Sequence, residues 1–294
     1  MKKIYLILPI LAGIMFGSTG IFVRTLTENG VDSTTLLFLR FSIAIIYMFI
    51  AILLTDKSLL KLEKGDFPLF IICGLCILGL NLCYNNSINT VPLSLAAVLL
   101  STAPVFVLII EYFTFNEKIT SIKVISVILV LIGCILATGL LEDNIASIST
   151  FGLISGIGSA LFWAVYTISS RKSIDNGTHT FTILLYALII ITIVSIPFTQ
   201  FGQISNFILL NPMQNIGFLL LHSLISFALP YIFITISLNH LDAGTVVILS
   251  SGEPVAALVF GAIVYGEIPS FLMLCGLFIT IIALLRLSKK SASK

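Results

Sequence analysis

The sequence predicts an all-α integral membrane protein with ten membrane-spanning helices, arranged as two five-helix repeats of inverted topology. The first observation is composition, since 58% of the 294 residues are hydrophobic and only 10% are charged. A soluble domain carries about a quarter charged residues and needs them to cover its surface. The second observation is that the apolar segments have helical length rather than the alternating pattern of barrel strands. The third is that landmarks of the first half recur in the second half.

The first repeat is expected to cover residues 1–143. A basic start followed by an apolar run is typical of a signal peptide, but this run is too long and lacks a convincing cleavage site. We therefore interpret it as the first span. Gly13, Gly17 and Gly20 fall on one face of that helix, and such a face lets another backbone approach closely. The five predicted spans are residues 4–23, 34–54, 67–86, 92–113 and 121–140.

The second repeat is expected to cover residues 144–294. Polar connections are predicted at residues 171–179 and 200–215. The five predicted spans of this repeat are residues 150–170, 180–198, 216–238, 243–265 and 269–285.

The two halves share a register of 150 residues. Pro104 corresponds to Pro254, and Glu117 corresponds to Glu267 at the same spacing. Because five is an odd number of spans, the second copy must enter the membrane from the opposite side. Inverted repeats of this kind are typical of secondary transporters.

The distribution of charge predicts the orientation. With the N-terminus in the cytoplasm, all but two of the 15 Lys and Arg residues lie on the cytoplasmic side, the exceptions being Arg24 and Arg40. The connections expected outside carry acidic residues, such as Glu142 and Asp143. This asymmetry predicts a multi-pass protein of the cell membrane with both termini in the cytoplasm.

These features together resemble the EamA-type ten-helix members of the drug/metabolite transporter superfamily. The resemblance covers essentially the whole chain. It rests on Glu253–Pro254, on Glu117 and Glu267 after the fourth and ninth spans, on Arg40, and on the sequence FWAVY in the sixth span. It implies a cavity between the repeats, lined by helices one, three, four, six, eight and nine. It does not imply one substrate, since members carry amino acids, other metabolites or drugs. The first repeat departs from the second by having Ala103 before its proline.

Pro104, Pro254 and Glu253 are the first candidate site residues. Each proline removes a backbone donor in mid-helix, and we expect matching kinks that either gate the transporter or simply bend the helices. A carboxylate in the middle of a span is costly unless it is protonated, paired or hydrated. Glu253 is therefore a candidate proton carrier or contact for a cationic substrate group, with a structural hydrogen bond between helices as the alternative.

Polar residues in two other spans are further candidates. Arg40 could hold a substrate carboxylate, or it could be a structural cation bonded to carbonyl groups or to a carboxylate. Asn81, Tyr84 and Asn85 share one face of the third span, which favours a cavity wall over hydrogen bonds between helices. For Glu111 we expect an interfacial salt bridge or a snorkelling contact.

Aromatic residues form the last candidate group. Trp163 is the only tryptophan and lies deep in its span, away from the interfacial belt. It shares a face with Tyr166. Together with Tyr84, Phe16 and Tyr231 these residues could line the cavity and bind an aromatic ring or a cation, whereas simple packing is the alternative for Phe16.

We predict a secondary transporter, and most simply an exporter, of small organic metabolites such as amino acids. The chain contains no P-loop and no pattern of a catalytic or metal site, so we expect no enzyme activity and no cofactor. The expected partners are a small-molecule substrate and the lipid bilayer, without nucleic acid. A homodimer is compatible with the sequence. The alternatives are a multidrug or quaternary-amine carrier and a receptor or scaffold that transports nothing.

Overall fold

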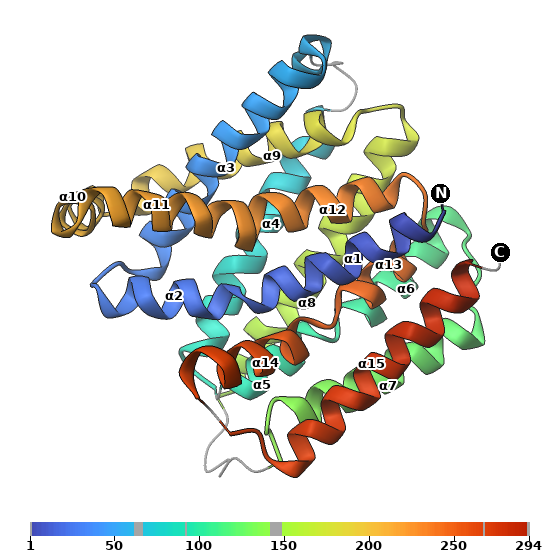
Figure 1. Ribbon diagram of the computed structural model, residues 1–294. Helices are drawn as coiled ribbons and strands as arrows, with labels where there is room; N and C mark the ends of the chain where they lie inside the picture. Colours follow the sequence, from blue (N-terminus) through green and yellow to red (C-terminus); the bar gives the residue numbers. More distant parts are fainter. Residues whose placement is uncertain (1, 62–66, 92, 142–148, 267, 293–294) are drawn as a thin grey trace.

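The chain folds into a bundle of long apolar helices (Figure 1). The computed structural model describes all residues except 1, 62–66, 92, 142–148, 267 and 293–294. Within that part of the chain, nine helical segments are long and apolar enough to cross a membrane. The apolar helix Ser121–Ala137 is slightly shorter and lies where the fifth span is expected. The all-α, ten-span prediction is confirmed.

The spans of the first repeat are built from seven α-helices. Two spans consist of two helices each, and η1 (Lys57–Leu60) follows the second span. The helices are α1 (Lys2–Gly17), α2 (Thr19–Glu28), α3 (Ser33–Thr55), α4 (Phe67–Ile88), α5 (Leu93–Leu100), α6 (Ala103–Phe115) and α7 (Ser121–Ala137).

The second repeat follows the same order. A π-helical turn, Leu224–Ala228, joins two helices of the eighth span, and η2 (Ile196–Phe198) ends the seventh. The helices are α8 (Thr150–Asp175), α9 (Thr180–Ser195), α10 (Phe201–Leu210), α11 (Pro212–Ser223), α12 (Leu229–Leu238), α13 (Ala243–Ser250), α14 (Glu253–Tyr265) and α15 (Phe271–Ala292).

The sequence-based boundaries differ from the structure in two places. Residues 200–215 are not an irregular connection, because they contain α10 and the start of α11. The first span is also longer than predicted and continues through α2. Glu142, Asp143 and Glu267 lie outside the described residues, whereas Glu117 is exposed.

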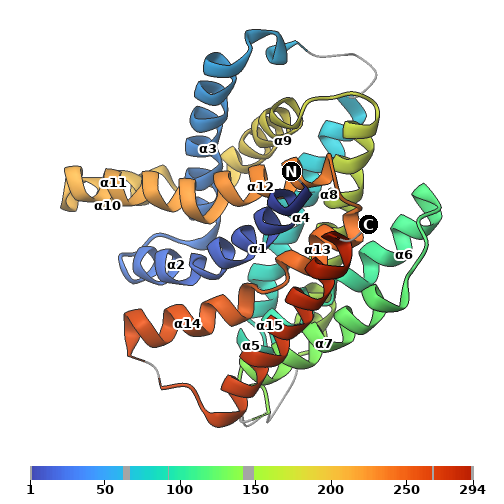
Figure 2. The ribbon, with the colours of Figure 1, turned by 45° about the vertical axis from the view of Figure 1, so that its right-hand side comes forward.

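Both ends of the chain lie at the same end of the bundle, here called the termini end (Figures 1 and 2). Helices α2, α10 and α11 lie at the other end, here called the far end. An even number of crossings requires both termini on one side of the membrane. The arrangement therefore agrees with two repeats of five spans each.

The repeats are held together by close helix packing. Helix α1 of the first repeat contacts α12, α13 and α14 of the second, and α4 packs along α8. Helices α7 and α15 meet through Gly133 and Gly276, where a Cβ at Gly276 would lie 2.5 Å from the Gly133 carbonyl oxygen. Small residues allow such approach between membrane helices. Large apolar side chains cover the outside, among them Phe113 and Phe271, as a bilayer requires.

Candidate functional site

The fourth and ninth spans are each interrupted near their middle. Helix α5 ends at Leu100 and α6 begins at Ala103, while α13 ends at Ser250 and α14 begins at Glu253. Pro104 and Pro254 are the second residues of the helices that follow. A proline fits there because it has no N–H to donate and its φ angle already suits a helix. The predicted matching kinks are therefore two helix breaks at equivalent positions.

The second break is packed against glycines of α1. A Cβ added to Gly13 would lie 2.5 Å from the carbonyl oxygen of Ser250, and one added to Gly17 would lie 2.8 Å from the carbonyl oxygen of Glu253. Gly20 has no such neighbour within 4 Å and instead lines the cavity described next. Two of the three glycines predicted to form one close-packing face therefore have that role.

A cavity of about 1080 Å³ extends from the helix breaks toward the far end of the bundle. Its walls come from both repeats, as the resemblance implies. At the termini end the space between the helices is closed by packed side chains, since every residue of α13 is buried. The polar, aromatic and proline side chains of the walls include Arg40, Asn81, Tyr84, Asn85, Ser101, Trp163, Tyr231, Ser250, Ser251, Glu253 and Pro254.

Arg40 lies at the buried part of this cavity, and 7% of the residue is exposed. Its Nη2 donates to Oδ1 of Asn81 at 2.6 Å, and Nδ2 of Asn81 donates to the Ile77 carbonyl at 2.7 Å. The amide is therefore oriented with its oxygen toward the guanidinium. The Nε atom of Arg40 has no hydrogen-bond partner among the described residues. Arg40 thus keeps an unused donor, and its side-chain partner is an amide rather than a carboxylate.

Two phenylalanine rings flank the same guanidinium. The Cζ atom of Arg40 lies 5.4 Å from the ring centroid of Phe41 and 5.2 Å from that of Phe227. The backbone carbonyl of Arg40 accepts a hydrogen bond from Ser223 at 2.7 Å. These contacts hold the cation in an apolar setting, where its attraction for an anion is strong.

Glu253 contributes the opposite charge to the cavity. As the first residue of α14, it lies at a helix N-terminus, which favours a carboxylate. No side-chain hydrogen bond or ion pair of Glu253 occurs within the described part of the chain. Its charge and that of Arg40 interact, but the two groups are not in direct contact. The cavity therefore presents a guanidinium and a carboxyl group that are not paired with each other.

Aromatic rings form one wall between these charges. The ring of Tyr231 lies 5.5 Å from Phe16, 5.6 Å from Trp163 and 4.3 Å from Phe227. Tyr166 stacks on Trp163 at 5.4 Å and lies within hydrogen-bond distance of Thr235, 3.3 Å between the hydroxyl oxygens. It is fully buried and supports the tryptophan from behind.

Most of the predicted site residues are brought together. Tyr166 and Pro104 do not line the cavity, whereas the other predicted residues do. Ser101 and Phe227 also line the cavity but were not predicted from the sequence. Ser101 could have been found from the register, because it corresponds to Ser251 at the second break, 150 residues later.

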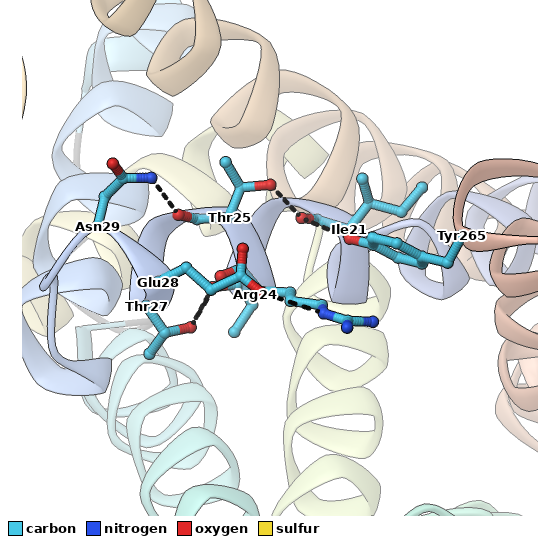
Figure 3. A network of polar contacts seen from close by, with 8 residues as sticks. Ile21, Arg24, Thr25, Thr27, Glu28, Asn29 and Tyr265 are labelled. Atoms are coloured by element: carbon cyan, nitrogen blue, oxygen red, sulfur yellow. Dashed lines mark hydrogen bonds and ion pairs between the residues drawn. The ribbon is translucent and has the colours of Figure 1, made fainter.

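The rim of the cavity joins α2 to α14 (Figure 3). The guanidinium of Arg24 lies 4.3 Å from the centroid of the Tyr265 ring and pairs with Glu28 at 3.3 Å. The Tyr265 hydroxyl donates to the Ile21 carbonyl at 3.5 Å. Thr25, Thr27 and Asn29 bond to backbone carbonyls of their own helix. An ion pair, Arg24 with Glu28, therefore lies at the mouth.

Comparisons with known proteins agree with this architecture. The model of the EamA-like transporter family matches twice, at residues 3–139 and 150–288. The chain is 23% identical over 283 residues to the pseudopaline exporter CntI of Pseudomonas aeruginosa, covering 96% of this chain and 95% of that protein. It is 29% identical over 197 residues to the threonine/homoserine exporter RhtA of Escherichia coli, covering 66% and 62%. A solved structure of 15% identity superposes with a TM-score of 0.79 over 96% of this chain.

Proposed function

Because the chain belongs to the EamA-like transporter family, we propose that it exports a small zwitterionic metabolite of the amino-acid type. It works by alternating access between the two repeats and needs no ATP. The substrate binds with its carboxylate at Arg40 and its ammonium group at Glu253, between the helix breaks. Its side chain lies against the wall of Phe16, Trp163 and Tyr231.

The observation that carries this proposal is the separation of Arg40 and Glu253. A charge buried without a partner is costly, and a ligand that supplies the missing partner recovers that cost. The Arg40 guanidinium lines the cavity and suits a carboxylate, for which its fork is well shaped. A zwitterion is a ligand that complements both groups at once.

Export is supported by two relatives that are named as exporters. One of them is named for threonine and homoserine, which are zwitterions. If both termini are in the cytoplasm of the cell, as the charge distribution predicts, the cavity of this structure opens to the outside and represents the state that releases substrate.

The test uses the purified protein in proteoliposomes with a panel of amino acids. For each amino acid the panel includes its amine, which lacks the carboxylate, and its N-acetyl derivative, which lacks the ammonium charge. We expect at least one amino acid to be transported and to stabilise the protein thermally, because ligands stabilise the state that they bind. Its amine and its N-acetyl derivative should neither stabilise the protein nor be transported. Absence of transport for every compound of the panel would contradict the proposal, and it is also the result expected of a scaffold.

Two variants assign the contacts. Arg40→Gln is expected to reduce the preference for the amino acid over its amine, while Glu253→Gln is expected to reduce the preference over the N-acetyl derivative. Each lost charge contact is expected to cost about 1.5–3 kcal/mol. Lys57, on the exposed η1 helix, provides a control as Lys57→Gln, which removes a charge outside the cavity. Equal loss of all ligands in both variants would argue against the assigned contacts.

The second candidate is a carrier of organic cations. The aromatic wall favours it, because aromatic faces attract cations. This candidate predicts that the amine binds at least as well as the amino acid and that Arg40→Gln improves its binding. The same panel therefore separates the two functions.

A further inference from the structure

A buried ionic cluster at the termini end joins the two repeats. Lys123, near the start of α7, pairs with Glu111 of α6 at 3.3 Å and with Asp242 at 2.6 Å. Glu111 also accepts a hydrogen bond from the backbone N–H of Gly244 at 3.1 Å. Glu111 and Lys123 belong to the first repeat, whereas Asp242 and Gly244 belong to the second. The expected salt bridge of Glu111 is thus a buried pair within the first repeat, and the contacts between the repeats are the Lys123–Asp242 pair and the hydrogen bond from Gly244 to Glu111.

These groups are withdrawn from solvent to different degrees. The side chain of Glu111 is 3% exposed, that of Lys123 is 8% exposed, and that of Asp242 is 27% exposed. Removing one member of a buried pair leaves the other without compensation, which is strongly unfavourable. Separation of the repeats at this end would break the Lys123–Asp242 ion pair and the hydrogen bond from Gly244 to Glu111 together, and would leave the Lys123–Glu111 pair within the first repeat.

The positions that correspond to these residues in the other repeat carry no ionisable group. In the register of 150 residues, Glu111 corresponds to Gly261, Lys123 to Met273 and Asp242 to Pro92. Gly261 and Met273 line the open cavity. The register therefore provides no counterpart of this ionic cluster in the other half of each repeat pair, although the repeats match in architecture.

We propose that Lys123, Glu111 and Asp242 form a lock that keeps the termini end closed while the far end is open. Opening toward the termini breaks the Lys123–Asp242 pair of the lock, and the residues at the register-equivalent positions cannot form such a pair. The lock thus shifts the resting equilibrium toward the state seen here. It depends on alternating access and not on which solute is carried.

The test measures access to the cavity from the termini side without any solute. A single cysteine replaces Ser101, which lines the cavity at the first helix break, in a chain whose five native cysteines are replaced. Its reaction with a membrane-impermeant maleimide is followed separately in vesicles of each orientation. The orientation of the vesicles is defined by protease removal of a C-terminal tag.

Two mild variants release the lock. Asp242→Asn keeps the N-cap bond to the Thr245 N–H but removes the charge opposite Lys123, because asparagine caps helices as well as aspartate. Glu111→Gln combined with Lys123→Met removes both ion pairs while keeping an acceptor for the Gly244 N–H. We expect both to raise the labelling rate from the termini side on the order of tenfold, with a lower rate from the far side.

The matched control is Asp175→Asn. It removes the ion pair at the same end between Nε of Arg171 and Oδ1 of Asp175, which lie 3.0 Å apart. Because both residues belong to α8, this pair cannot join the repeats. We expect its labelling rates to equal those of the parent. Far-side labelling together with a single peak in size-exclusion chromatography shows that each variant is folded. Folded lock variants with unchanged rates on the termini side, or an equal rise in Asp175→Asn, would overturn the proposal.

Discussion

Gly13 of α1 lies directly against the carbonyl oxygen of Ser250, the last residue of α13. A Cβ at Gly13 would lie 2.5 Å from that oxygen, a distance that side chains do not tolerate. The first helix is therefore fitted to the helix break that places Glu253 in the cavity. This contact makes the break part of the packing between repeats.

Gly13→Ala is accordingly expected to destabilise the protein by about 1–3 kcal/mol, because the methyl group forces α1 away from the break. The matched control is Gly20→Ala, since Gly20 is on the same span and has no neighbour within 4 Å. Alanine is the better helix former, so the control should be neutral or stabilising by up to about 1 kcal/mol. Thermal unfolding of both variants in detergent checks this difference, and equal stabilities would contradict it.

The fold was predictable because the bilayer imposes simple rules. Segment length and hydropathy placed the spans, and the register between Pro104 and Pro254 indicated the repeat. These rules fail where tertiary packing decides the local secondary structure. Residues 200–215 contain Asn, Gln and Pro and look like a loop, yet Phe201–Leu210 forms a helix. A proline likewise predicts a disturbance of the helix, but a break rather than a kink depends on the packing around it.

The site was predictable to the level of residue types and helix faces. Asn81, Tyr84 and Asn85 share a face and do line the cavity. The bond between Arg40 and Asn81 was not predictable, because it depends on how two helices are offset along each other. Trp163 and Tyr166 also share a face, but one sequence does not say which ring reaches the cavity and which lies behind it.

Trp163→Ala should weaken substrate binding more than Phe271→Ala. The indole belongs to the aromatic wall, whereas Phe271 at the start of α15 is 80% exposed on the outside of the bundle. Loss of one stacking contact is expected to cost about 0.5–1.5 kcal/mol beyond the lost area. Binding of the best amino acid from the panel provides the measurement, with both variants confirmed as folded. Equal affinities would remove Trp163 from the site.

Tyr166→Phe tests the supporting position of this ring. It removes a hydroxyl that lies near Thr235 but keeps the stack on Trp163. We expect a loss of stability of about 1 kcal/mol and little change in substrate affinity. Tyr84→Phe is the comparison, because Tyr84 lines the cavity and should affect affinity instead. A large loss of affinity in Tyr166→Phe would show that the ring contacts the substrate.

The orientation in the membrane is tested with single cysteines. Ser58 in η1 and Asn29 after α2 are both exposed and belong to opposite ends of the bundle. If both termini are cytoplasmic, an impermeant maleimide added to intact cells should label a cysteine at Asn29 and spare one at Ser58. Permeabilised cells should show labelling of both. The reverse pattern in intact cells would invert the transporter and place the open cavity toward the cytoplasm.

The last prediction concerns energy coupling through Glu253. Glu253→Gln keeps the shape of the side chain and can still donate and accept hydrogen bonds, but the group is fixed as neutral. If the carboxylate carries a proton between the two open states, the variant should lose accumulation driven by a pH gradient and retain exchange of labelled for unlabelled substrate. If it only holds the ammonium group, affinity should fall while the dependence on pH stays that of the parent. Gradient-driven uptake and exchange in proteoliposomes, at matched protein incorporation, distinguish these outcomes. Unchanged affinity and unchanged pH dependence would exclude both roles and leave Glu253 as a structural residue at the start of α14.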